Sequence, residues 1–430
     1  MKLGQSIAVA VGLALLLTLA STAGAEVPAK PTFTKDVLPI LQQNCQECHR
    51  PKPINMSGMV APFAMMNYEE TRPWAKAMAK AVKNQVMPPW FATEEFHGVF
   101  RNERTLTEDE VATIVKWADM GAPRGNPKDA PKALTFSNKE WWLGEPDLVV
   151  SLPEPVWVGD EVEDWQPTIP VQISLDAMPE DRWIRSLECQ PGSDVVHHIV
   201  VYADYPTLEG EAGGTRAFGQ SNIGGLAPGA EPSLLQDGYG ILLKAGAKLN
   251  VNMHYHKEAA EGSGTFDQSE IGFHFYPKDA DVKPIQIDPI GSLDFEIPPG
   301  QENWTVGMAR TFDRPFRVLS YLPHMHVRGV AAEYKAYLPN GTVETLLDVP
   351  RYDYNWQLYY EYPSPRSFPA GTRVEVKMTF DNSENNPSNP DPEKPIRFGA
   401  ATTDEMALGW MYYTFAEDIA EKDTKAVGTD

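Results

Sequence analysis

The stretch S-D-V-V-H-H-I-V-V-Y, residues 193–202, is mostly β-branched and predicts a buried strand. His197 and His198 lie side by side in its middle. Because neighbours in a regular strand point to opposite faces, one imidazole should face the core, where an unpaired polar ring costs free energy. A metal ion would satisfy both rings if the strand twists or bulges there. The alternative is one core histidine bonded to a carbonyl and one surface histidine.

Short β-branched and aromatic runs of the same kind continue from residue 145 to residue 416, and turn signals such as P-N-G at 339–341 separate them. They predict two all-β antiparallel sandwich (jelly-roll-like) domains, residues 145–288 and 289–416. We expect the acidic tail, residues 417–430, to be disordered.

Residues 26–125 instead show helical periodicity. Helices are predicted from Thr34, over 71–82 with Thr71 as N-cap, and from Thr107, where Thr107 and Glu110 form a capping box and Gly121 ends the helix. The expected fold class is therefore multidomain, with an all-α cytochrome c domain at 26–125, a polar linker at 126–144 and then the two sandwiches.

Residues 1–25 combine Lys2, an apolar run and the small residues Ala23-Gly24-Ala25, which is typical of a secretory signal peptide. We expect a periplasmic or secreted protein with no membrane span in the mature chain. The net charge of −22 argues against nucleic acid as a partner.

A C-x-x-C-H motif at Cys45, Cys48 and His49 predicts covalently bound haem c, the two thiols forming thioethers and His49 binding the iron. A disulfide with an incidental histidine is the alternative. Met87, in N-Q-V-M-P-P-W, is the preferred sixth ligand. The competing methionines are Met56, Met59, Met65 and Met66, and the remaining cysteine, Cys189, is expected to be a buried apolar thiol. This region, roughly residues 32–125, resembles class I cytochrome c domains.

Six of the nine histidines fall in three tight clusters: His197 and His198, His254 and His256, and His324 and His326. In an H-x-H pair both side chains share one face of a strand and can grip one ion such as copper, zinc or iron. For His256, turning away to solvent is the alternative. Met406 begins an apolar strand, and beside two imidazoles its thioether would favour reduced copper.

The order V-H-H, M-H-Y, P-H-M-H and T-D-E-M resembles the copper type II, ascorbate-dependent monooxygenases, the family of peptidylglycine α-hydroxylating and dopamine β-monooxygenases. The resemblance covers about residues 145–416. It implies one copper at His197, His198 and His254, and a second, oxygen-binding copper at His324, His326 and Met406, across an open cleft. The family's carboxylate-binding arginine is replaced by Leu322 and a tyrosine by Trp410, so we expect a more apolar substrate than a peptide.

The resemblance implies an enzyme that hydroxylates a C–H bond of a small organic substrate with O2. Its electrons would come from an ascorbate-like reductant or a redox protein, and the haem would relay them to the copper sites. The alternatives are an electron-transfer cytochrome with non-catalytic copper-binding β domains, and a copper-storage or copper-delivery protein.

Overall fold

The computed structural model describes residues 27–51, 61–136, 141–204, 221–229, 232 and 235–416. The predicted signal peptide and acidic tail lie outside these residues. Within the described ranges, no helix has both the length and the apolar character needed to cross a membrane.

The first sandwich forms where β-branched runs alternate between buried and exposed positions. One of its sheets has the order β1-β11-β5-β8-β12, and the other has the order β3-β9-β6-β7 with β4 also paired to β9. A shared cluster of buried side chains, including Ile184, Val201 and Phe273, fills the space between them. The strands are β1 (Leu148–Ser151), β2 (Val156–Val158), β3 (Asp164–Trp165), β4 (Thr168–Gln172), β5 (Arg182–Gln190), β6 (Val196–Ala203), β7 (Ser221–Leu226), β8 (Tyr239–Leu243), β9 (Lys248–His256), β10 (Thr265–Asp267), β11 (Glu270–Phe275) and β12 (Lys283–Pro284).

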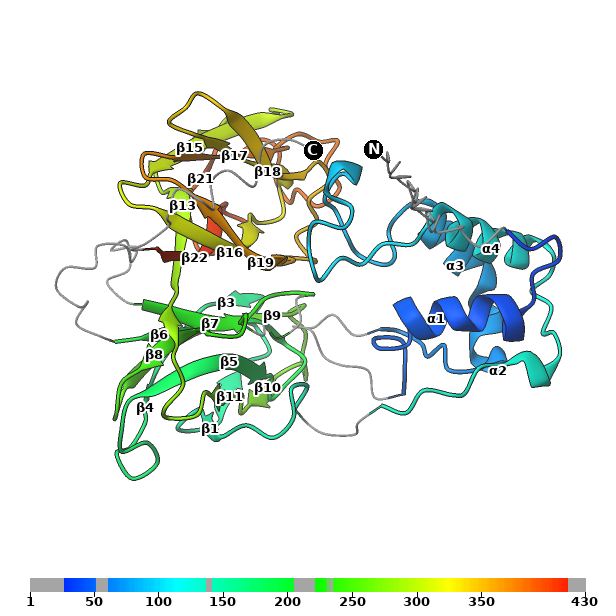
Figure 1. Ribbon diagram of the computed structural model, residues 1–430, viewed down its shortest axis with the longest axis horizontal. Helices are drawn as coiled ribbons and strands as arrows, with labels where there is room; N and C mark the ends of the chain where they lie inside the picture. The colour runs from blue at the N-terminus through cyan, green and yellow to red at the C-terminus, as the bar shows by residue number, and fades with distance from the viewer. Residues whose placement is uncertain are drawn as a thin grey trace, which may run out of the picture.

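The second sandwich packs a sheet of order β13-β22-β16-β19 against one of order β15-β20-β17-β18. Buried aromatic residues such as Phe316, Tyr334 and Tyr413 dominate its core. The two sandwiches lie one above the other in Figure 1. The strands are β13 (Gln286–Ser292), β14 (Glu296–Ile297), β15 (Trp304–Thr311), β16 (Phe316–His324), β17 (Gly329–Tyr337), β18 (Val343–Val349), β19 (Tyr360–Phe368), β20 (Arg373–Phe380), β21 (Ile396–Arg397) and β22 (Ala407–Phe415).

The expected all-α cytochrome c domain is not present, and the predicted fold class is wrong in this respect. The chain is mostly β, and the longest helix among its described residues, α4, has only 12 residues. Most of the short helices lie to one side of the sandwiches (Figure 1), and η3 lies against the second sandwich, where Phe96 is buried. They are η1 (Phe33–Val37), α1 (Leu38–Asn44), α2 (Tyr68–Thr71), η2 (Arg72–Trp74), α3 (Ala75–Lys83), η3 (Glu94–Phe96), α4 (Glu108–Asp119) and η4 (Pro127–Asp129).

Residues 26–125 have helical periodicity but do not form a separate helical domain, because part of this region packs against the second sandwich. Between α3 and α4 the chain leaves the helices as an irregular arm, residues 84–107, and reaches the second sandwich (Figure 1). Trp90, Phe91 and Phe100 of this arm are buried in the core of that sandwich. The backbone N–H of Thr93 also donates to the carbonyl of Asp348, at 3.0 Å. Part of the apolar surface of residues 26–125 is therefore buried against the sandwich, while the helices enclose only two small clusters of their own.

The details at the helix ends differ. The predicted capping box is confirmed, because Thr107 and Glu110 exchange side-chain and backbone hydrogen bonds at the start of α4. Gly121, just beyond α4, has a positive φ of 83°, as expected of a helix-ending glycine. Thr71 is not an N-cap, since it is the last residue of α2, and its hydroxyl donates to the Asn67 carbonyl at 2.7 Å.

Candidate metal centres

An irregularity in β6 answers the question raised by the adjacent histidines. In the pairing of β6 with β9, Val196 is opposite Tyr255 and His198 is opposite His254, so His197 is an extra residue in β6. Such a bulge bends the strand and changes the direction of its side chains. The ring centroids of His197 and His198 consequently lie 5.7 Å apart. A bulge, one of the two conditions under which both rings could share a metal ion, is therefore present.

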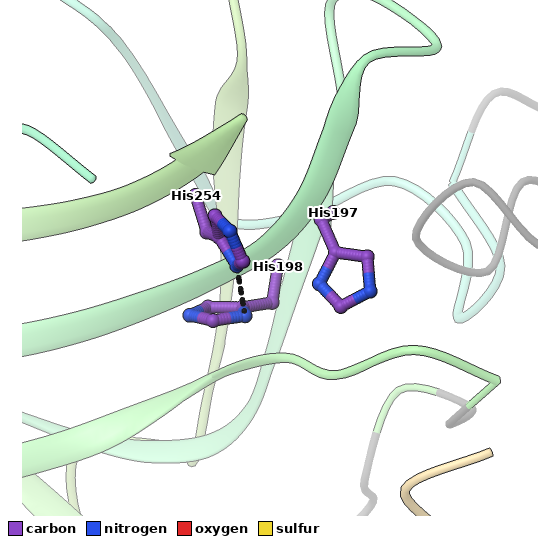
Figure 2. A group of neighbouring side chains, drawn as sticks. All are labelled: His197, His198 and His254. Atoms are coloured by element: carbon purple, nitrogen blue, oxygen red, sulfur yellow. Dashed lines mark hydrogen bonds between the residues drawn. The ribbon is translucent and has the colours of Figure 1, made fainter. Parts of the chain in front are cut away.

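Three imidazoles converge at this bulge, and we call them the first cluster: His197, His198 and His254. One nitrogen from each ring lies within 4.8 Å of the others (Figure 2). The Nδ1 atoms of His198 and His254 are 3.1 Å apart. Neutral imidazole nitrogens at this spacing share one proton or face a common cation.

Asp164 fixes the orientation of the His254 ring. Its carboxylate lies 3.0 Å from Nε2 of His254, so this nitrogen carries the proton and the Nδ1 lone pair faces the cluster. Burial acts to raise the pKa of Asp164, but hydrogen bonds from His254 and Thr402 hold that pKa well below its usual range. A carboxylate on the second nitrogen is the arrangement that commonly supports metal-binding histidines.

His256 is not part of the first cluster. Its side chain is half exposed, and its ring centroid is 6.4 Å from that of His254. The sequence allowed His256 either to pair with His254 at one ion or to turn toward solvent. Its exposed position corresponds to the second alternative.

Burial keeps the His197 and His198 imidazoles uncharged. It lowers the pKa of His197 to about 3 and the pKa of His198 well below the usual value, and the neighbouring imidazoles lower both further. At neutral pH these rings therefore offer lone pairs rather than positive charge, as metal coordination requires.

The second cluster consists of His324, His326 and Met406. The rings of His324, at the end of β16, and His326 have centroids 5.4 Å apart. Nδ1 of His324 lies 2.6 Å from the side-chain oxygen of Gln357, and Nδ1 of His326 lies 3.3 Å from the carbonyl of Asp404. Both rings thus donate through Nδ1 and leave Nε2 for a ligand. Met406 precedes β22 and lines the same cavity as the two imidazoles.

A buried carboxyl group holds the second cluster together. Glu405, fully buried, accepts hydrogen bonds from the backbone N–H groups of His326 at 2.8 Å and Arg328 at 2.7 Å. Burial raises the pKa of Glu405 to about 8, although these hydrogen bonds act in the opposite direction. The Arg328 guanidinium donates to the carbonyl of Thr403, at 2.8 Å. The residues before Met406 are therefore tied to the H-x-H segment.

Both clusters reach one cavity of about 350 Å³, the first through His198 alone and the second through His324, His326 and Met406. This cavity lies between β6 and β7 of the first sandwich and β16 and β22 of the second. Beside this cavity the two sandwiches touch, because the Asp164 carboxylate accepts hydrogen bonds from the backbone and hydroxyl of Thr402 in the other sandwich. Tyr354 also connects them: its ring stacks on His197 at 5.0 Å and meets His326 edge-on at 6.2 Å.

A third site surrounds the C-x-x-C-H motif. Cys45, Cys48, His49 and Met87 line one largely apolar cavity of about 280 Å³. Nδ1 of His49 lies 3.1 Å from the carbonyl of Phe63, which leaves Nε2 as a possible iron ligand. Burial lowers the pKa of this imidazole. The two cysteines are thiols, not a disulfide, so the residues fit a covalently attached haem.

The choice among the methionines remains a prediction at this third site. Met65 lines the same cavity as Met87, whereas Met66 does not, and Met56 and Met59 lie outside the described residues. Cys189 is buried in the core of the first sandwich, as expected of an apolar thiol.

Sequence reasoning missed the residues that support the clusters, namely Asp164, Tyr354, Gln357 and Glu405. Only Glu405 could have been singled out from the sequence, because it directly precedes the expected ligand Met406. The other three lie in stretches without periodicity, and only the folded chain brings them to the imidazoles.

Comparison with known proteins gives no family. No family model matches the chain, and no curated protein matches it. Among solved structures, the VP2 subviral particle of infectious bursal disease virus is 11% identical, with 63% of this chain and 81% of that chain covered and a TM-score of 0.15. A tandem CBM22 domain of Paenibacillus barcinonensis Xyn10C is 9% identical, covering 64% and 98%, with a TM-score of 0.14. An oxalate decarboxylase is 7% identical, covering 66% and 82%, with a TM-score of 0.13.

Proposed function

We propose that this protein is an exported, haem- and copper-containing monooxygenase that hydroxylates a C–H bond of a small organic molecule. One oxygen atom of O2 enters the C–H bond, and the other leaves as water with two protons and two electrons from an external reductant. The observation that supports the proposal is a group of three imidazoles with the spacing of metal ligands, and a cavity lined both by its member His198 and by His324, His326 and Met406.

Copper bound at the two clusters would supply oxygen activation and one-electron storage. The chain's own residues prepare both places. Asp164 and Gln357 set the proton positions on His254 and His324. The unprotonated nitrogen of His254 then faces His198, and that of His324 is left for a ligand. Glu405 fixes the backbone next to His326 and Met406, which keeps the ligands close without relying on the metal.

A haem attached through Cys45 and Cys48 would add a one-electron carrier to the same chain. This part of the proposal requires no all-α cytochrome domain, because short helices and the apolar cavity already supply the attachment site. Trp356, from the segment that also carries Tyr354, lines this cavity and so gives it a physical connection to the clusters.

The experiment is metal analysis of the purified full chain together with oxygen uptake in the presence of ascorbate and a panel of small organic molecules. We expect two coppers and one iron per chain and substrate-dependent oxygen uptake. His254→Ala should lose one copper, whereas the matched variant His256→Ala should keep both, because His256 lies outside the first cluster. A His254→Ala protein with both coppers would contradict the first site, and metal-loaded protein without oxygen uptake would favour the electron-transfer alternative.

The haem is tested separately. Cys45→Ser with Cys48→Ser should abolish covalent haem, seen as loss of haem absorbance from the denatured chain, while copper loading persists. In stopped-flow reduction of the intact protein, haem oxidation should accompany copper turnover. Haem that stays reduced throughout turnover would rule out the electron relay but not the copper chemistry.

A further inference from the structure

The cavity between the two sandwiches is built from alternate residues of facing strands. On β22 and just before it, Met406, Leu408, Trp410 and Tyr412 are two residues apart and all line the cavity. Side chains at this spacing share one face of a strand. On the opposite side, β6 contributes His198, Val200 and Tyr202 in the same alternation. One wall therefore runs from a thioether to aromatic rings.

The neighbouring strand β16 makes this wall continuous. Leu322 is paired with Trp410, and His324 is paired with Leu408. Leu322, Tyr359 and Tyr412 also belong to a buried apolar cluster that includes Tyr239 of the first sandwich. At about 3.3 Å per residue, the row from Met406 to Tyr412 spans roughly 20 Å.

The cavity contains no charged side chain. Its lining residues, all of them described, include no aspartate, glutamate, lysine or arginine, although 22% of the chain is charged. Burial raises the pKa of Tyr202 and that of Tyr359 to about 12, so these phenols stay neutral. A charged ligand would lose its hydration here without gaining a counter-ion, which is costly.

The metal clusters strengthen this discrimination. Their ligands are imidazoles and a thioether, which carry no charge to balance a bound cation. A cationic substrate would therefore be repelled by the metal, and an anionic one would be drawn to coordinate it instead of lying along the wall.

From this geometry, and resting on the proposed function, we propose that the substrate is an uncharged, largely apolar small molecule. Its body lies along Leu408, Trp410 and Tyr412, and its oxidised C–H bond lies at the Met406 end of the row. Hydroxyl or amide groups are its only polar groups, and they meet phenols and side-chain amides such as Tyr202 and Asn252.

The test compares ring compounds of one size and different charge. Benzyl alcohol, benzoate, benzylammonium and cyclohexanol are titrated into the full chain by isothermal calorimetry, before and after copper is removed with a chelator. We expect both alcohols to bind about tenfold or more tightly than either ion after chelation. Benzoate or benzylammonium that binds the chelated protein as tightly as benzyl alcohol would overturn the proposal, as would alcohols that do not bind.

Matched variants test whether the compounds bind along Leu322 and the row from Met406 to Tyr412. Leu322→Arg should shift the preference toward benzoate by about tenfold or more, while Leu322→Met should leave the preference unchanged. Trp410→Ala should weaken benzyl alcohol binding, whereas Trp157→Ala, at a side chain that is 52% exposed on the first sandwich, should not. Equal behaviour of Leu322→Arg and Leu322→Met would overturn the placement.

The two proposals can fail separately. Selective binding of the alcohols by protein that takes up no copper would overturn the monooxygenase and leave the apolar site. Copper loading and oxygen uptake with no preference among the four compounds would overturn the substrate class alone.

Discussion

The first and second clusters hold their imidazoles in different ways. In the first cluster, His254 donates to the carboxylate of Asp164 at 3.0 Å. In the second, His324 and His326 donate to the neutral oxygens of Gln357 and the Asp404 backbone. A carboxylate makes an imidazole a stronger donor to a metal than a neutral hydrogen-bond acceptor does. If copper binds as proposed, the first cluster would suit both of its oxidation states, and the second, with its thioether, would suit the reduced ion.

The largest effect is expected from removing the buried acid of the second cluster. Glu405→Ala leaves the N–H groups of His326 and Arg328 without their acceptor, so the free energy of unfolding should fall by about 2–4 kcal/mol. Urea unfolding and metal analysis should show a weakened second sandwich that loses one copper. The exposed Glu393→Ala is the control, and equal stability of the two variants would contradict this role.

The thioether gives the next largest effect. Met406→Ala should lower the affinity of the second cluster for Cu(I) by about 100-fold or more, because the loss of a ligand costs more than the loss of a supporting residue. The first cluster should be unaffected. Met411→Leu is the control, because Met411 is a core residue of β22, the strand that follows Met406, and leucine is close to methionine in volume. Competition with a Cu(I) chelator measures the Cu(I) affinity of both variants. An unchanged affinity in Met406→Ala would contradict the role of the thioether in distinguishing the second cluster from the first.

The carboxylate at the first cluster should matter less, but selectively. Asp164→Asn should weaken divalent metal binding at the first cluster by about 10–100-fold and leave the second cluster intact. Asp160→Asn, in a surface turn of the same sandwich, should bind metal normally. Thr402→Val removes the hydroxyl's hydrogen bond to Asp164 and leaves the contact between Asp164 and His254 in place. If Thr402→Val lost as much metal affinity as Asp164→Asn, the contact between the sandwiches, and not the carboxylate beside His254, would determine the affinity.

The smallest effect concerns the ring that touches both clusters. Tyr354→Leu should remove the stacking on His197 at a cost of about 0.5–1.5 kcal/mol, seen as a fall of a few degrees in Tm. Tyr354→Phe keeps the ring and should lie close to the parent protein. A Tyr354→Phe variant as unstable as Tyr354→Leu would show that the hydroxyl, 3.5 Å from Nδ1 of His197, is the important group.

The ligands could be predicted from the sequence better than their surroundings could. Alternation of side chains indicated that His197 and His198 need a bulge, and β6 has one at that place. The spacing of His324 and His326 likewise predicted two rings near one point, and they lie there although His326 follows the end of β16. The bulge at His197 is a local property of a strand, which is why sequence alone indicates it.

What sequence could not provide are contacts between distant segments. Asp164 reaches His254 across 90 positions and Thr402 across 238. The failed prediction of an all-α domain has the same origin, since helical spacing at residues 26–125 said nothing about Trp90 and Phe100 packing into the second sandwich. Periodicity reports which side of an element is apolar, not which partner covers it.

The segment between β18 and β19, residues 350–359, contacts the first cluster, the second cluster and the cavity of the C-x-x-C-H motif through side chains only a few residues apart. Tyr354 touches both clusters, Trp356 borders the cavity of the C-x-x-C-H motif, and Gln357 holds His324. Trp356 also packs so closely on Gly229 that a Cβ there would overlap its ring. Inserting or deleting a single amino acid here would misplace all three side chains at once. For engineering, this segment is therefore a unit to be transplanted whole, with its length unchanged, whenever parts of this scaffold are recombined.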